Sequence, residues 1–416
     1  RQLHFSSSCV IDTGVHNVNV SGQLFGGATL QKLGPGTLSL LNQSNQNVAW
    51  DIQGGILQGT TSAIRGPLSI ATNTQVNFNQ GPGSPSDFNS AISGGGVVSV
   101  TGGGRVNLNA ASPNWSGGLS VTNSVVGVSP ATLGTGAVTL NGSNLLFSSN
   151  GTVGNRLVLS GNNNILEVNP VSADIRWNGV VSEAGSLDKR GEGVLRLTAT
   201  NNNYSGGTIL NGGHLTANGG SLGTGRLTLN AGTFFYTGGD LATGSHTFSN
   251  DITINPGGGA IHSYSNTGTL SGVISGSGGL TKIGAGTLVL TAVNTYQGGT
   301  SVNGGILAAD ARNGSGLGAF APGSLVTING ATLELRGFDS LGYFTGAPIV
   351  QNNGGVITTN GSATHHNLGR VNLRGGTLTA VGQGAGPGYG SYVFNDTIVS
   401  QASATTATIS APLVSL

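Results

Sequence analysis

Apolar and polar residues alternate in short runs along the chain, and glycines interrupt these runs every few residues. The segment 271–307 shows this most clearly, because Val, Ile and Leu alternate there with Thr, Ser and Asn. A period of two predicts short β-strands, and glycine or Asn-Gly predicts tight turns between them, since these residues adopt positive φ easily. No stretch shows a helical period of useful length. The pattern therefore predicts an all-β chain.

One motif recurs and defines a repeat. The segment 185–215 matches 271–307 closely, 26–57 is a looser copy, and 95–121 keeps the frame with Val100 where the other copies have lysine. Each copy is too long for one structural unit, so we infer that it holds several coils of a solenoid of parallel strands. At roughly 20 to 25 residues per coil, the chain is expected to form about 17–20 coils. The positions that define the repeat are Lys32, Lys189, Lys282, Gly191, Gly193, Gly206, Gly207, Gly284, Gly286, Gly298 and Gly299.

The composition fits a solenoid better than compact domains or a disordered chain. Glycine supplies 76 of 416 residues without a triplet period, which excludes collagen, and hydrophobic residues make up only 36%. A disordered chain would combine low hydrophobicity with high net charge, but the net charge is +1. Near neutrality also argues against nucleic acid as a partner. No run of 18 apolar residues occurs, so membrane insertion by this segment is not expected.

The repeat pattern also suggests how the chain is divided. Residues 1–25 lack the glycine punctuation and are predicted to be an N-terminal cap or pairing segment, and 26–416 a continuous β-helix. Neither end shows an obvious polar cap, so end-to-end self-association is a specific hypothesis. The single cysteine, Cys9, is expected to be a buried small residue. The macro-repeats are placed at approximately 26–87, 88–172, 173–270 and 271–349, with a partial copy at 350–416.

The motif carries a family resemblance. The run GGLTKIGAGTLVLTA…NTYQGGTSVNGGIL within 271–307 closely resembles the passenger-associated transport repeat of bacterial autotransporters. The match is good at 185–215, partial at 88–121 and weak at 26–57. The resemblance implies a secreted, right-handed, single-stranded parallel β-helix at the bacterial cell surface or outside the cell. In that family the repeat is linked to export and to folding outside the cell, and it carries no catalytic residues.

Parallel β-helices also include polysaccharide-active enzymes, whose carboxylates cluster on one face. The nearest grouping here is Glu183, Asp188 and Glu192, which we interpret as solvated variation around a lysine rather than an acid/base pair. The histidine pair 365–366 is interpreted as a surface loop, because neighbouring strand residues point to opposite faces. No catalytic residue, cofactor site or metal site is therefore predicted.

Two sets of repeat residues are candidates for binding. The aromatic residues either cover glycine-rich corners, which we favour, or face a ligand and stack on sugars. The lysines either keep an exposed edge charged, which we favour, or hold an anionic ligand. The aromatic set comprises Trp50, Trp115, Tyr204 and Tyr296.

The predicted function is a non-catalytic, rigid extracellular segment for display, adhesion or fibre formation. Cell-surface glycans, other surface proteins or further copies of the chain are the expected partners. The alternatives are a polysaccharide-active enzyme on the same fold and a carbohydrate-binding module.

Overall fold

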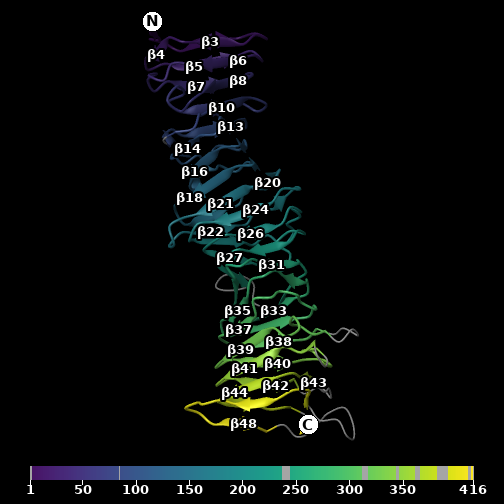
Figure 1. The fold of residues 1–416 in the computed structure, drawn as a ribbon. Coiled ribbons are helices and arrows are strands. Elements are labelled where there is room, and N and C mark those ends of the chain that lie inside the picture. Colours follow the sequence, from purple (N-terminus) through teal and green to yellow (C-terminus); the bar gives the residue numbers. More distant parts are fainter. Residues whose placement is uncertain are drawn as a thin grey trace. The chain divides into compact units, whose positions relative to one another are not determined.

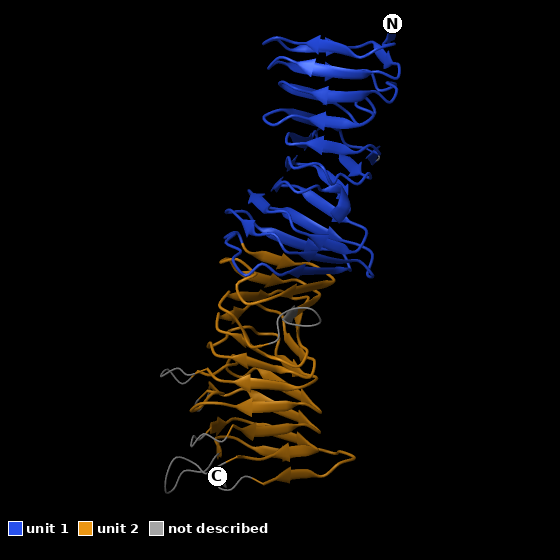
Figure 2. Cartoon of the chain, turned by 180° about the vertical axis from the view of Figure 1, so that it is seen from behind, with its two compact units in different colours: residues 1–206 blue, residues 207–416 orange. Residues whose placement is uncertain are grey.

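The computed structural model describes residues 2–83, 85–236, 244–311, 317–342, 346–360, 366–381, 392–410 and 414–415. The chain divides into two compact units, residues 1–206 and 207–416 (Figure 2). In each unit short strands stack coil upon coil (Figure 1). Each ladder between the named strands of the described ranges is parallel, and the one helix there is a 3₁₀ turn, η1 (Pro130–Thr132). The prediction of an all-β parallel solenoid is confirmed, and the number of turns is about 17.

Unit 1 carries its strands on several stacked faces. The first coils use β1 (Gln2–His4) with β4 (Gln23–Phe25), and a sheet of β2 (Cys9–Asp12), β5 (Thr29–Leu33), β7 (Ala49–Ile52), β9 (Leu68–Ile70) and β12 (Ile92–Gly94). A longer sheet holds β3 (Val18–Val20), β6 (Thr37–Leu40), β8 (Ile56–Gly59), β10 (Gln75–Asn79), β13 (Val97–Thr101), β15 (Leu119–Thr122), β17 (Val138–Asn141), β20 (Leu157–Ser160) and β23 (Val181–Ser182). Another ladder holds β11 (Ser86–Phe88), β14 (Arg105–Leu108), β16 (Val125–Val128), β18 (Asn144–Phe147), β21 (Asn164–Val168) and β24 (Leu187–Arg190). The last holds β19 (Gly151–Val153), β22 (Asp174–Trp177) and β25 (Val194–Leu197).

Unit 2 repeats the arrangement. One ladder holds β26 (Thr208–Leu210), β28 (Leu227–Leu229), β31 (Ile252–Ile254) and β34 (Ile274–Ser275). A second holds β27 (His214–Ala217), β29 (Thr233–Tyr236), β32 (Gly259–Ser263), β35 (Leu280–Ile283), β37 (Thr300–Val302), β39 (Leu325–Asn329), β41 (Ile349–Asn353), β44 (Val371–Arg374) and β47 (Ile398–Ser400). A third ladder holds β30 (His246–Phe248), β33 (Thr267–Leu270), β36 (Thr287–Leu290), β38 (Ile306–Ala309), β40 (Thr332–Leu335), β42 (Val356–Thr359), β45 (Gly376–Leu378) and β48 (Ala407–Ile409). A fourth ladder holds β43 (His366–Leu368), β46 (Tyr392–Phe394) and β49 (Val414–Ser415).

The core consists of aliphatic columns that run from coil to coil. In unit 2, Leu288, Leu307, Leu333, Ile357 and Leu378 are register partners on successive coils, and all are fully buried. Burying one such side chain contributes roughly 1.5 to 3 kcal/mol. A slip of one residue would turn a whole strand's apolar set outward, so the alternation fixes the register.

Residues 2–20, with strands β1, β2 and β3, form the first described coil. Strands β1, β2 and β3 pair in parallel with β4, β5 and β6 of the next coil. The prediction that Cys9 is buried is wrong, because its side chain is exposed. Cys9 pairs with the buried Leu30 on one side, and no described strand pairs with β2 on the other.

Within the described ranges, no helix has the length and apolar character needed to cross a membrane.

Candidate functional site

The lysine of each motif copy points into the solenoid. Lys32, Lys189 and Lys282 are all 0% exposed. In the ladder Lys282 stands between Ile261 and Val302, so its aliphatic stem occupies one layer of the apolar column. The prediction that the lysines keep an exposed edge charged is therefore wrong, and so is the alternative that they hold an anionic ligand at the surface.

The buried ammonium group binds carbonyl groups at the turn that follows. Lys282 Nζ donates hydrogen bonds to the carbonyl oxygens of Ile283 at 2.9 Å, Gly284 at 2.8 Å and, in the next coil, Gly304 at 2.9 Å. Such bonds satisfy buried carbonyls that would otherwise lack a partner. The same bonds recur from Lys32 to Leu33 (3.0 Å), Gly34 (2.8 Å) and Gly54 (2.8 Å), and from Lys189 to Arg190 and Gly191 (both 2.8 Å).

A left-handed glycine makes this arrangement possible. Gly34, Gly191 and Gly284, two residues after each lysine, have φ of 77°, 78° and 81°. Residues other than glycine rarely adopt these positive φ values. A Cβ atom at Gly284 would also collide with the carbonyl oxygen of Ser263 in the preceding coil. The lysine and this glycine are therefore one structural unit, in which the turn presents its carbonyls to the ammonium group.

The copy without lysine has a different turn. Val100 occupies the lysine position in the column, between Phe78 and Val121. The turn after it has two consecutive left-handed glycines, Gly102 with φ of 95° and Gly103 with φ of 84°. An aliphatic residue at this position thus accompanies a turn with another backbone geometry.

Burial governs the titration of the motif lysines. It lowers the pKa of Lys282 to about 8. It also lowers the pKa of Lys189 to about 8, against the opposing effect of the Asp188 and Glu167 carboxylates. The pKa of Lys32 is lowered for the same reason, with Asp12 opposing. A pKa of about 8 leaves Lys189 and Lys282 mostly charged at pH 7, in agreement with the three hydrogen bonds that Lys282 donates.

The repeat aromatics are buried as well, which corrects the alternative that they face a ligand. Trp50, Trp115, Tyr204 and Tyr296 are at most 2% exposed. Trp115 Nε1 donates to the carbonyl of Gly96 at 2.9 Å. The hydroxyl of Tyr296 hydrogen-bonds Thr300 Oγ1, and burial raises its pKa. A sugar cannot stack on faces that solvent does not reach.

Trp50 does not share the frame of the other aromatics. Trp115 and Tyr296 each precede a strand, β15 and β37, whereas Trp50 lies within β7 and pairs with Leu30 and Leu68. The prediction of one frame for all four residues is therefore wrong for Trp50, because it belongs to the apolar column of its own sheet.

Sequence reasoning missed the buried asparagine two residues before the aromatic. Asn294 Oδ1 accepts the backbone N–H of Ile274 at 2.7 Å, and its Nδ2 donates to the carbonyl of Ala319 at 2.8 Å. Asn202 accepts the backbone N–H of Val181 in the same way, at 2.7 Å. The recurrence of this asparagine as Asn-x-Tyr, at Asn202 and Asn294, was a usable signal.

The acidic residues considered for catalysis each have a different setting. Asp188 is ion-paired with Arg190 at 2.7 Å, Glu183 lies 3.5 Å from Arg156, and Glu192 is exposed. Two of the three carboxylates are therefore paired with separate arginines.

The structure describes only one residue of the predicted histidine pair 365–366. His365 lies outside the described residues, and His366 is fully buried in β43 beside Tyr392, with ring centroids 6.5 Å apart. The expectation of a surface loop is therefore wrong for His366. In the part of the chain that the structure describes, no group of three or more His, Cys, Asp or Glu is arranged to hold a metal ion.

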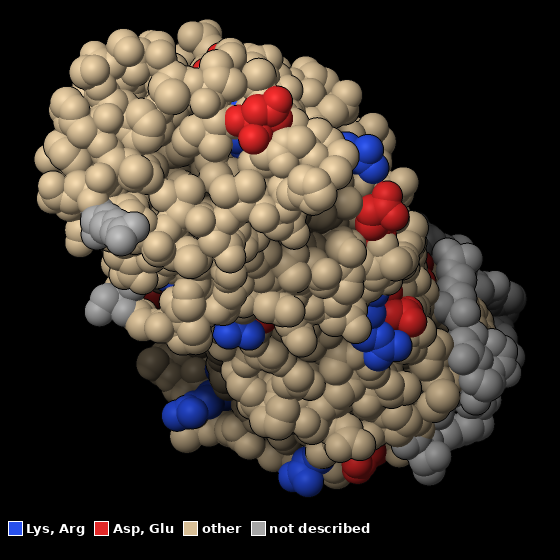
Figure 3. Space-filling model, turned by 90° about the horizontal axis from the view of Figure 1, so that it is seen from above, with Lys and Arg blue, Asp and Glu red and all other residues tan. Residues whose placement is uncertain are grey.

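The outward faces carry few charges and many amides. Figure 3 shows a few Lys, Arg, Asp and Glu side chains, some of them side by side, on a mostly uncharged surface. Asparagines stack in hydrogen-bonded ladders, such as Asn303, Asn329 and Asn353, with Nδ2–Oδ1 distances of 2.7 and 2.8 Å. These ladders satisfy amide groups along the coils.

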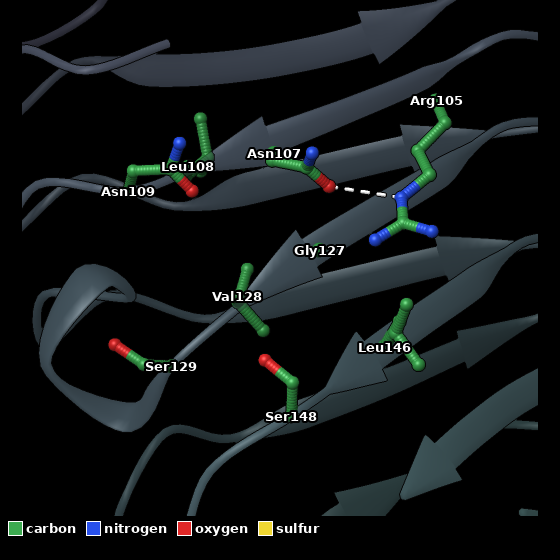
Figure 4. Close-up of a pocket in the computed structure, with 9 residues that line it drawn as sticks. All are labelled: Arg105, Asn107, Leu108, Asn109, Gly127, Val128, Ser129, Leu146 and Ser148. Atoms are coloured by element: carbon green, nitrogen blue, oxygen red, sulfur yellow. Dashed lines mark hydrogen bonds between the residues drawn. The ribbon is translucent and has the colours of Figure 1, made fainter. Parts of the chain in front are cut away.

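Two of the open depressions in the described part of unit 1 lie on strands that are ladder partners. The first, of about 250 Å³, is lined by Arg105, Asn107, Asn109, Gly127, Leu146 and Ser148, among others (Figure 4). The second, of about 500 Å³, is lined by residues that include Asn47, Thr61, Arg65, Asp87 and Asn89. Strands β11 and β14, which contribute to the two depressions, are direct ladder partners. These are the candidate contact surfaces that the sequence did not indicate.

Comparison with known proteins agrees with the repeat geometry. The family described as Passenger-associated-transport-repeat matches residues 187–217 and 280–309, which contain Lys189 and Lys282 with their glycines, asparagines and tyrosines. The Adhesin BmaC autotransporter of Brucella suis biovar 1 (strain 1330) is 31% identical over 365 residues, or 82% of this chain. The chain spans about one tenth of the length of that relative. No solved structure matches.

The matched residues are those that lock one coil to the next, so the family signature and the observed packing have one physical basis. The chain is a passenger segment of the autotransporter type, a parallel β-solenoid built with passenger-associated transport repeats.

Proposed function

We propose that this chain is a non-catalytic adhesive segment at the bacterial cell surface, which holds outward side chains in fixed positions for contact with a host or neighbouring cell. The observation that carries the proposal is the packing between coils, in which Lys282, Tyr296 and Asn294 are buried and hydrogen-bonded. The adhesin relative supports adhesion as the purpose of this surface.

The mechanism follows from the ladder. Parallel strands at about 4.8 Å spacing place equivalent outward residues in columns, and each column is held by backbone hydrogen bonds on both sides. A ligand therefore meets a surface whose backbone is already ordered, which lowers the entropic cost of binding. The pairing of Asp188 and Glu183 with arginines supports adhesion over catalysis.

Adhesion is tested with beads coated with the purified chain and incubated with cultured epithelial cells. We expect more beads bound per cell than with albumin-coated beads, and competition by the soluble chain. Bead numbers equal to the albumin control would contradict the proposal. Incubation of the chain with pectin, hyaluronan and heparan fragments, followed by reducing-end analysis, tests catalysis, and new reducing ends would favour an enzyme.

A further inference from the structure

The two depressions of unit 1 form a polar strip that crosses successive coils. The 61–66 turn, β11, β14, β16 and β18 supply their linings in order along the stack. Thr61 Oγ1 donates to Ser86 Oγ at 2.7 Å and links the turn to β11. The linings carry amides, hydroxyls and two arginines, Arg65 and Arg105, with one carboxylate, Asp87. We call these two linings the polar strip.

A glycine within a strand creates the space at the centre of the first depression. Gly127 occupies an outward position of β16, beside Asn107 of β14 and Leu146 of β18. It is not among the residues with positive φ, so its backbone does not require glycine. A Cβ atom there would collide with Asn107 Oδ1 and lie 3.4 Å from Arg105 Nη2. The missing side chain leaves the floor of the depression open beneath the guanidinium group (Figure 4).

Arg105 is oriented by a hydrogen bond from its Nε atom, and its two terminal nitrogens remain available to a ligand. Arg105 Nε donates to Asn107 Oδ1 at 2.9 Å (Figure 4). Asn107 Nδ2 in turn donates to Asp87 Oδ1 at 2.7 Å. This chain of bonds fixes the plane of the guanidinium group and occupies the nearby carboxylate. Among the described residues, no hydrogen bond from the two terminal nitrogens of Arg105 is observed. A fork of this kind suits a carboxylate, which it binds through two parallel hydrogen bonds.

The rest of the first depression offers groups that suit sugar hydroxyls. Asn109 Nδ2 donates to Asn89 Oδ1 at 2.8 Å, which leaves Asn109 Oδ1 as an acceptor. Ser148 Oγ lines the opposite side and has no hydrogen bond within the described residues (Figure 4). The polar strip has no exposed aromatic anchor of the kind that dominates protein–protein contacts. An extended polar ligand therefore fits it better than a protein surface.

We propose that the polar strip binds a carboxylate-bearing glycan, with its carboxylate on Arg105 and its hydroxyl groups on Asn109 and Ser148. Arg65 offers a second cationic position along the same strip. The inference deepens the proposed function, on which it rests, by naming the contact site and the ligand class.

The test is titration of the full chain with hyaluronan oligosaccharides, sialyllactose and lactose by isothermal calorimetry. We expect the chain to bind one or both carboxylated probes and to bind lactose at least tenfold more weakly. Arg105→Gln should weaken carboxylate binding at least tenfold, and Arg105→Lys should weaken it less, because the charge stays but the fork is lost. Arg156→Gln is the matched control, since it removes one exposed positive charge of unit 1 outside the polar strip and should leave affinity within twofold.

Each outcome decides the inference. Binding of hyaluronan alone identifies an internal uronate as the source of the carboxylate, and binding of sialyllactose alone identifies a terminal sialic acid. Absence of binding to both, equal affinity for lactose, or unchanged affinity in Arg105→Gln overturns the proposal. Circular dichroism of each variant checks that it is folded. If coated beads adhere to cells while the carboxylated probes do not bind, only this inference fails; if the beads do not adhere, the proposed function fails.

Discussion

Replacing Lys282 by methionine tests whether the buried lysine holds the coils together. Methionine keeps the unbranched stem between Ile261 and Val302 but removes the ammonium group. Three carbonyl oxygens, those of Ile283, Gly284 and Gly304, lose their donor. The substitution therefore separates the packing of the stem from the hydrogen bonds of its charged end.

The magnitude follows from two opposing effects. A hydrogen bond from a charged group contributes about 1.5 to 3 kcal/mol, so three such bonds represent about 4.5 to 9 kcal/mol. Removing a buried charge recovers part of this, because the desolvation cost of one ion in a protein is several kcal/mol. We expect a net loss of about 2 to 4 kcal/mol in the local free energy of opening.

Native-state hydrogen exchange of the full chain measures this locally, which suits a solenoid whose coils need not unfold together. The informative amides are those of Asn303 and Ile306, which donate to the carbonyls of Lys282 and Gly286 across the affected turn. The matched control is Arg226→Gln, which removes an exposed cation 3.6 Å from Asp251 and should change the opening free energy by less than about 0.5 kcal/mol. Equal protection in the Lys282→Met and Arg226→Gln variants would refute the reasoning.

Three further outcomes are expected. Gly284→Ala should destabilise its turn by more than about 2 kcal/mol, measured by hydrogen exchange, because the strain of the left-handed backbone and the collision of the new Cβ atom add. Gly323→Ala, at φ of 66° with no atom near the new Cβ, should destabilise its turn by only about 1 kcal/mol. Equal losses in the two variants would exclude the collision. Folding lowers the pKa of Lys282 to about 8, so above that pH the unfolded chain binds more protons than the folded chain. The free energy of unfolding should therefore rise between pH 8 and 10 relative to that of Lys282→Met, measured in parallel denaturant titrations. A constant difference between the two chains would contradict the lowered pKa. Asn294→Ala should cost about 2 to 4 kcal/mol, since a buried backbone N–H and a carbonyl both lose their partner, and protection like that of the native chain at these amides would argue against this role.

The strand pattern could be predicted because each link is local. Alternation with period two selects strands, and glycine supplies left-handed turns such as the one at Gly284. The recurrence of one motif over more than one copy indicated stacking, and the column from Leu288 to Leu378 is its physical consequence. The family resemblance rested on the same residues, which the match at 187–217 and 280–309 supports.

The direction of individual side chains could not be predicted in the same way. Lysine is rarely fully buried, so composition argued for an exposed Lys282. Only the fold shows that three carbonyl oxygens accept hydrogen bonds from its Nζ, which offset the desolvation cost of burying the charge. Trp50 was placed with Tyr296 by its spacing, but the register assigns it to a strand.

The sequence by itself determined the class of architecture, the family motif and the coil-forming alternation, because these depend on neighbours along the chain. The tertiary structure alone decided that the lysine position is an internal donor, since its acceptors include Gly304, which belongs to another coil. It also decided where the polar strip lies, because Asp87, Arg105 and Gly127 meet only when successive coils stack in register.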